Sequence, residues 1–156
     1  MITDINTIIN IRDAAKQNGQ TVVFTNGCFD IIHPGHCKYL TESRKMGDIL
    51  IIGLNSDASI GRIKGNGRPV NPELDRAFVL DTLKPVDYVV IFEEDTPFEL
   101  ISQVLPDVLV KGNDYAIEDI IGADVVIDNG GVVRTIPLVA GKSTTSIISR
   151  MVDVHT

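Results

Sequence analysis

The chain has 156 residues, with 14 Lys and Arg against 21 Asp and Glu, so its formal net charge is −7. Hydrophobic residues make up 44% and charged residues 22%, an ordinary globular composition that excludes a disordered chain and suits one domain over residues 1–156. The acidic balance and the absence of a Lys/Arg block argue against a nucleic-acid partner, because phosphate backbones are held chiefly by clustered cations. A small phosphorylated ligand is still compatible with this charge.

Targeting and redox signals are weak along the whole chain. The apolar runs, such as residues 49–54, are far shorter than the roughly 20 residues that span a bilayer, so we expect no membrane helix. The first twelve residues mix acids and amides with isoleucines and do not resemble a secretory signal, which favours a cytoplasmic protein. Cys28 and Cys37 have neither CxxC nor zinc-type spacing, so we expect both to be reduced.

In chain order, the patterns predict a helix over 4–17, a strand over 21–25, a helix from 34 to 47 and a strand over 49–54. A polar segment rich in Gly and Lys follows over 55–70, then a helix over 72–83 with an inward apolar face of Leu74, Phe78 and Val79, and a strand over 88–92. Next come a helix between 95 and 105, a strand over 108–110, a helical stretch near 117, a strand over 125–127, a final apolar run over 132–139 and a helix from 143.

This alternation of short β-rich runs with helical patterns is typical of βαβ units. It predicts an α/β fold, a Rossmann-like three-layer sandwich around a central, mainly parallel sheet of five to six strands. In such sheets ligands bind beyond the carboxyl ends of the strands, where the strand order reverses. Strand one is usually at that reversal, and strand four is expected beside it.

The loop after strand one is therefore the first candidate for a site. Gly27 permits close backbone approach to a ligand, and Gly35 lets His33 and His36 converge at a helix start. Helix N-termini present free N–H groups and partial positive charge, so this is a natural anion site. The alternative is that these are two surface histidines in a turn, but their position between a buried strand and a helix favours an anion-binding site. A zinc site is disfavoured, because a third protein ligand is missing.

A second phosphate candidate lies at the head of the last helix. A P-loop is excluded, because Ile136 occupies the position where that motif needs its first glycine. Ser143 instead suits an N-cap, with the N–H groups of Thr144 and Thr145 available to an anion. Plain helix capping explains the same residues equally well, so both interpretations stay open.

Several other polar residues are candidates by position. Lys64 lies in a glycine-loosened loop that can fold over a substrate, while the alternative is a solvated surface loop. Arg76 on the following helix is a candidate surface ion-pair partner. Residues 111–115 end strand four, so Asp114 is placed to accept a ribose hydroxyl.

Taken together, the blocks at residues 26–36, 55–57, 68–71, 76, 111–115 and 143–145 resemble the HxGH nucleotidyltransferase superfamily and, within it, the ADP-heptose synthase family. The likeness covers about residues 21–148, and the blocks at 93–97 and 106–112 are more specific than HxGH alone. The resemblance implies transfer of AMP from ATP to D-glycero-D-manno-heptose 1-phosphate, giving ADP-heptose and pyrophosphate for lipopolysaccharide core biosynthesis.

The resemblance also implies roles for particular residues. It assigns catalytic contacts to His33, His36, Lys64 and Arg76. It implies nucleotide contacts from Thr25, Asn26, Gly27, Cys28, Phe29, Gly35, Lys111, Gly112, Asp114, Ser143, Thr144 and Thr145. Substrate contacts are implied for Asp30, Asn55, Asp57, Arg68 and Tyr115. Many relatives have an Arg-Thr pair before Ser-Thr-Thr, and whether Lys142 replaces that arginine is open.

No protein metal cage is expected. Mg²⁺ would be carried mainly by the triphosphate, with Asp30 and Asp57 as outer contacts. The expected partners are ATP, a sugar 1-phosphate, a second copy in a homodimer, and a pathway kinase on a separate chain. One alternative function is a cytidylyltransferase acting on glycerol 3-phosphate or another phospho-alcohol; another is a nucleotide-binding module without turnover.

Overall fold

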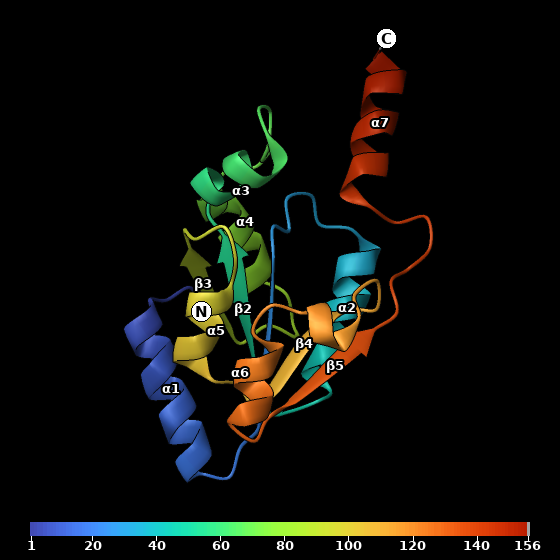
Figure 1. Cartoon of the computed structure of the whole chain (residues 1–156). Helices are drawn as coiled ribbons and strands as arrows, with labels where there is room; N and C mark the ends of the chain where they lie inside the picture. Colours follow the sequence, from blue (N-terminus) through green and yellow to red (C-terminus); the bar gives the residue numbers. More distant parts are fainter. Residues whose placement is uncertain (156) are drawn as a thin grey trace.

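The computed structural model describes residues 1–155. Its centre is a five-stranded sheet in the order β3-β2-β1-β4-β5, with every neighbouring pair parallel (Figure 1). The strands are β1 (Val22–Gly27), β2 (Ile49–Asn55), β3 (Tyr88–Phe92), β4 (Val108–Gly112) and β5 (Val132–Ile136). The chain builds outward from β1 to β3 and then returns to place β4 on the other side of β1. The order therefore reverses between β1 and β4, as the sequence predicts.

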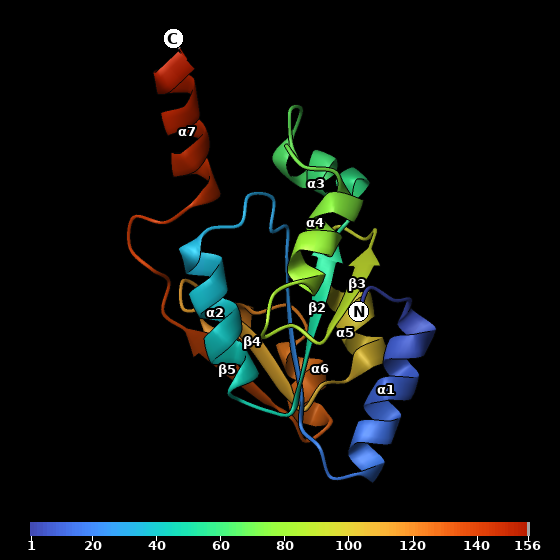
Figure 2. The same ribbon diagram turned by 180° about the vertical axis from the view of Figure 1, so that it is seen from behind.

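Helices cover both faces of the sheet. They are α1 (Ile5–Gln17), α2 (Pro34–Arg44), α3 (Asp57–Lys64), α4 (Glu73–Asp81), α5 (Phe98–Val104), α6 (Ala123–Asp128) and α7 (Thr144–His155), with a 3₁₀ turn η1 (Ile117–Asp119). One face packs against α1, α5 and α6, and the other packs against α2 and α4 (Figures 1 and 2). The predicted three-layer α/β sandwich is confirmed, with five strands that are all parallel.

Two apolar cores hold these layers together. Neighbouring residues of β1 point to opposite faces, so Phe24 enters the core under α1 and α5 while Val23 enters the core under α2 and α4. Both side chains are fully buried. A central strand buried on both faces explains the uninterrupted apolar run that predicts it.

Helix α7 extends away from the sandwich in both views (Figures 1 and 2). It has a marked amphipathic pattern but no buried residue. Isolated helices of about 12 residues are marginal in water, so packing normally supplies their stability. None of the helices in the described residues 1–155, α7 included, is long and apolar enough to cross a membrane.

The strand predicted over residues 125–127 is wrong: this segment belongs to helix α6, and residues 132–136 form β5 instead. Ala123 and Val126 are buried while Ile127 is half exposed, which is a helical spacing and not a strand alternation. The run of β-branched residues at 125–127 favours a strand locally, and packing on β4 and β5 overrides it.

The segment over 55–70 is not wholly a polar loop, because residues 57–64 form α3. Ser56 caps this helix by accepting the N–H of Ser59 at 3.1 Å, and Ile60 anchors it in the interior. One buried apolar residue in eight gives too weak a periodicity for the helix to be predicted from sequence.

The predicted inward face of helix α4 is also wrong. Leu74 and Phe78 are 67% and 66% exposed, whereas Ala77, Leu80 and the charged Arg76 are buried. The helix turns this way because Arg76 finds four hydrogen-bond acceptors beneath it, described below. Because the charged Arg76 occupies a core position, the buried face of α4 lies about one residue away from the apolar stripe expected from the sequence.

Candidate functional site

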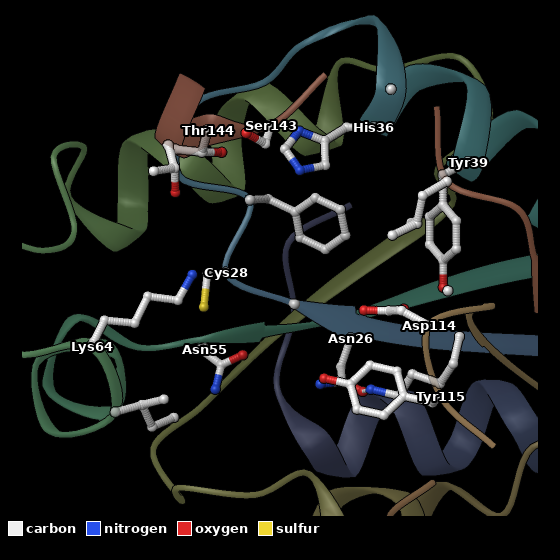
Figure 3. Close-up of a pocket in the computed structure, with 18 of the residues that line it drawn as sticks. Asn26, Cys28, His36, Tyr39, Asn55, Lys64, Asp114, Tyr115, Ser143 and Thr144 are labelled. Carbon is white, nitrogen blue, oxygen red and sulfur yellow. Dashed lines mark hydrogen bonds between the residues drawn. The ribbon is translucent and has the colours of Figure 1, made fainter. Parts of the chain in front are cut away.

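A cavity of about 670 Å³ opens at the carboxyl ends of the strands, between the loops that follow β1, β2, β4 and β5. Among the residues predicted for the site, those that line it are Asn26, Gly27, Cys28, Phe29, His33, Gly35, His36, Asn55, Lys64, Arg68, Lys111, Gly112, Asp114, Tyr115, Ser143, Thr144 and Thr145. Figure 3 shows His36 with Ser143 and Thr144 at one end of the cavity, and Asn26 with Tyr115 at the opposite end.

The histidine pair is built by the first turn of α2. His33 is the N-cap residue, and its Nδ1 accepts the Gly35 N–H at 3.1 Å. A Cβ on Gly35 would lie 2.8 Å from this imidazole, so only glycine allows the close approach. Because Nδ1 is an acceptor, the neutral ring carries its proton on Nε2 and offers a donor there.

The rings of His33 and His36 stack, with centroids 3.8 Å apart and an interplanar angle of 25°. Burial lowers the pKa of His36 to about 4, and the charges of His33 and Lys64 act in the same direction. Burial and then the charge of Lys142 lower the pKa of His33 as well. The lowered pKa values favour the neutral form of both rings at physiological pH, in which each ring can donate one hydrogen bond.

The opposite end of the cavity is built from β1 and β4. Lys111 Nζ donates to Oδ1 of Asn26 and so ties the two strand ends together. Burial lowers the pKa of Lys111 to about 8, although Asp114 and Cys28 act to raise it. This lysine is a partly desolvated cation close to its titration range at neutral pH.

The head of α7 closes one side of the cavity. Ser143 Oγ accepts the N–H of Ser146 at 3.1 Å, so the predicted capping interaction is present. Lys142, Thr144 and Thr145 line the same wall. Lys142 is close enough for its charge to act on His33.

Four predicted site residues do not line the cavity, and all four support it from beneath. Thr25 is fully buried and its hydroxyl bonds the Tyr39 hydroxyl at 2.8 Å. Asp57 pairs with Arg76 at 2.7 Å, and Asp30 pairs with Arg68 at 2.9 Å. The Thr25 hydroxyl and both Asp30 oxygens are occupied by other parts of the chain, whereas Asp57 is 43% exposed and uses only Oδ1 for Arg76.

Arg76 is the largest of these supporting groups. Its guanidinium donates to the carbonyls of Asn71 at 2.9 Å, Cys28 at 2.7 Å and Asn55 at 2.9 Å, besides the Asp57 carboxylate. It thus joins the loop after β1 to the end of β2. The alternative of an ion pair at the surface is wrong only in its place: Arg76 does pair with Asp57, but the Arg76 side chain has no exposed surface.

The cavity also has lining residues that sequence reasoning missed. They are Tyr39, Ile63, Asp95, Pro97, Asp119, Ile120, Ile121, Pro137, Leu138 and Val139. Tyr39 follows His36 by three residues on α2, so helical spacing could have identified it. The others lie on loops and helix ends whose sequence carries no local signal of contact with a ligand.

A family model described as cytidylyltransferase-like matches residues 24–150. The chain belongs to the cytidylyltransferase-like family. It is 53% identical over 150 residues to "Bifunctional protein HldE" of a Nitratiruptor species, covering 96% of this chain and 32% of that protein. With the HldE protein of Syntrophotalea carbinolica it shares 54% over 144 residues, covering 92% of this chain and 29% of the relative. The chain thus spans about a third of the length of these curated relatives.

Two solved structures resemble this chain in fold. A lipopolysaccharide core biosynthesis protein from Thermoplasma volcanium has a TM-score of 0.61 at 29% identity, covering 78% of this chain and 98% of that one. A pantoate-beta-alanine ligase from Francisella tularensis has a TM-score of 0.64 at 15% identity, covering 100% of this chain and 78% of that one, a likeness of fold alone. The predicted resemblance to nucleotidyltransferases is confirmed.

Proposed function

We propose that this chain transfers AMP from ATP to D-glycero-D-manno-heptose 1-phosphate, giving ADP-heptose and pyrophosphate for the lipopolysaccharide core. The family match and the identity of 53% to a bifunctional HldE protein support the choice of reaction. The observation that carries the proposal is the stacked pair of neutral histidines at the α2 N-terminus, which shares a cavity with Lys64, Lys142 and the head of α7.

In the proposed reaction an oxygen of the sugar phosphate attacks the α-phosphorus of ATP. A new P–O bond forms, the bond from the α-phosphorus to the bridging oxygen breaks, and its electron pair leaves with pyrophosphate. The attacking phosphate is already ionised, so no general base is assigned and no covalent enzyme intermediate is needed. The chain contributes positioning and charge stabilisation.

Each end of the cavity has its own task in this scheme. His33, through its Nε2–H, and His36 would donate to the phosphates as negative charge builds on the leaving group. Lys64, Lys142 and the N–H groups at the head of α7 would neutralise the same charge. At the other end, residues 26–28 and 111–114 would hold the nucleoside, with Asp114 accepting a ribose hydroxyl.

Mg²⁺ is part of the proposal as a companion of the triphosphate. Within residues 1–155, no group of three His, Cys, Asp or Glu side chains could hold a metal ion. Asp30 and Asp57, the predicted outer contacts, are both engaged in ion pairs. A cation bound by phosphate oxygens and waters needs no protein cage and would withdraw charge from the triphosphate.

The test is pyrophosphate release by purified protein with ATP, MgCl₂ and heptose 1-phosphate. We expect turnover in the wild type and a loss of about 100-fold or more in kcat for His36→Ala, as for removal of a transition-state donor. A Glu42→Gln variant, which loses an exposed ion pair with Lys45 on the same helix, is the matched control. Equal turnover in His36→Ala would contradict the proposed role of the pair.

A cytidylyltransferase acting on glycerol 3-phosphate or another phospho-alcohol is the second candidate, favoured by the description of the matching family model. It would use the same phosphate-binding end of the cavity. A marked preference for CTP in the release assay would support it. The non-catalytic module would be supported by ATP binding without pyrophosphate release from any sugar phosphate tried.

We also propose a homodimer in which a second copy covers α7. Met151 and Val154 are 53% and 80% exposed on this helix, and Ile147 continues the same stripe. Light scattering should give twice the chain mass, and Met151→Glu should shift the protein toward monomer. The cytoplasmic location stays a prediction within this proposal.

A further inference from the structure

Asp30 is a buried carboxylate whose two oxygens are both occupied. Its side chain is 1% exposed and lies in the loop between β1 and α2. The N–H groups of Val70 and Asn71 donate to it at 2.9 to 3.0 Å, and Arg68 Nε donates at 2.9 Å. Asn71 Nδ2 also donates to the Asp30 carbonyl at 2.6 Å. These bonds fasten residues 68–71 to the histidine loop.

Arg68 is the member of this network that reaches the cavity. Its side chain is 19% exposed and lines the cavity wall. Asp30 takes only Nε, and within residues 1–155 no protein acceptor is found for the two terminal nitrogens. A guanidinium anchored through Nε presents these two nitrogens as a fixed fork, which matches a phosphate group.

The loop that carries Arg68 has few other restraints. Gly65 and Gly67 before it have φ values of +84° and +87°, and residues 65–67 are exposed. Arg68 is held by its ion pair with Asp30, whereas the charges of Lys64 and Lys142 act on the histidines. Besides Lys64, Lys111 and Lys142, the cavity is therefore lined by a guanidinium that Asp30 positions.

We propose that Asp30 is a positioning residue, and that its ion pair with Arg68 holds the arginine fork for the phosphate of the acceptor substrate. This rests on the proposed function, in which two phosphorylated substrates meet in one cavity. The triphosphate takes the histidine end, and the phosphorylated acceptor takes Arg68. Burial opposes the charge of Asp30, but the N–H groups of Asn71 and Val70 and the Arg68 guanidinium outweigh it and keep the carboxyl pKa below its usual value.

The experiment compares Asp30→Asn, Arg68→Gln and the double variant in steady-state kinetics. We expect the KM for heptose 1-phosphate to rise about tenfold or more in each, as for a lost charged hydrogen bond, and the KM for ATP to stay within about twofold. The double variant should be no worse than Arg68→Gln, because Asp30 acts through Arg68. A merely structural Asp30 would raise both KM values and add to the Arg68 effect, which would overturn the proposal.

Two further measurements keep the test decisive. If Asp30→Asn fails to fold, the comparison of Arg68→Gln with Arg68→Lys replaces it. Lysine keeps the charge but lacks the two-nitrogen fork, so Arg68→Lys should bind the acceptor more tightly than Arg68→Gln and less tightly than the wild type. Calorimetric titration with inorganic phosphate, in protein saturated with a non-hydrolysable ATP analogue, needs no turnover. Binding weakened about tenfold in Arg68→Gln supports the pair even if heptose 1-phosphate is not a substrate. Equal phosphate affinity in both proteins overturns it even if the reaction proceeds.

Discussion

His33 and His36 lie with their rings stacked 3.8 Å apart at the start of α2. Two imidazolium ions at this distance would repel each other, so the stack is compatible with at most one charge. The ring nitrogen that faces Gly35 is fixed as an acceptor, which leaves the opposite nitrogen of His33 as a donor. The pair is thus prepared to donate hydrogen bonds without being a permanent cation.

The first prediction concerns the protonation of this pair. Burial and the neighbouring His33 charge lower the pKa of His36 to about 4, so this ring should stay neutral throughout the range from pH 5 to 8. Nitrogen-15 NMR of ligand-free protein, with His36→Ala to assign the signals, measures this directly. A His36 pKa at or above the ordinary value of about 6.5 would contradict the geometry.

The second prediction concerns alkaline pH. Burial lowers the pKa of Lys111 to about 8, so the lysine is charged below that pH and becomes neutral above it. If its charge attracts the nucleotide, kcat/KM for ATP should be level below pH 8 and fall about tenfold per unit above it. Lys111→Gln should have a lower kcat/KM that no longer falls above pH 8, whereas a variant of the exposed Lys84, Lys84→Gln, should keep this fall. If kcat/KM still falls above pH 8 in Lys111→Gln, the titration of Lys111 is not the cause of the fall.

The third prediction concerns stability. Arg76→Met leaves one buried and two part-buried carbonyls without their donor, together with the Asp57 carboxylate, and we expect a loss of about 3–5 kcal/mol in the free energy of unfolding. Arg62→Met is the matched control: its ion pair with Asp95 is at least half exposed and is worth less than about 1 kcal/mol. Urea denaturation of both variants makes the comparison. Similar losses in the two would show that the Arg76 network adds nothing.

The fourth prediction separates capping from anion binding at Ser143. Asp is as good an N-cap as Ser, so Ser143→Asp should preserve α7 while placing a negative charge beside the proposed phosphate site. We expect ATP affinity to fall about tenfold or more, with helix content by circular dichroism unchanged. Ser143→Asn is the neutral capping control. Unchanged ATP affinity in Ser143→Asp would leave capping as the role of this residue.

Sequence reasoning found the sheet and most of the cavity, because both depend on local signals. The uninterrupted apolar run of β1 and the Gly35 between two histidines can be recognised without any tertiary information. The reversal of strand order beside β1 then places the loop at residues 25–36 and the loop at 111–115 on one cavity.

The errors share a physical cause, which is that long-range partners decide burial. Arg76 looks like a surface residue until the carbonyls of Cys28 and Asn55 are placed beneath it. From the sequence, Asp30 is a candidate substrate contact, but in the structure the N–H groups of Val70 and Asn71 occupy its carboxylate oxygens. Local propensity likewise favours a strand at 125–127, and only packing against the sheet makes it helical.

The most direct test of the proposed AMP transfer is a competition in one vessel between ATP and CTP at equal concentrations, with heptose 1-phosphate, MgCl₂ and limiting protein. Mass spectrometry of the products measures the ratio of the two nucleotide sugars without further assumptions. We predict ADP-heptose as the dominant product, formed in step with pyrophosphate and lost in His36→Ala. Dominant CDP-heptose, or no nucleotide sugar at all from folded protein that binds ATP, would contradict it.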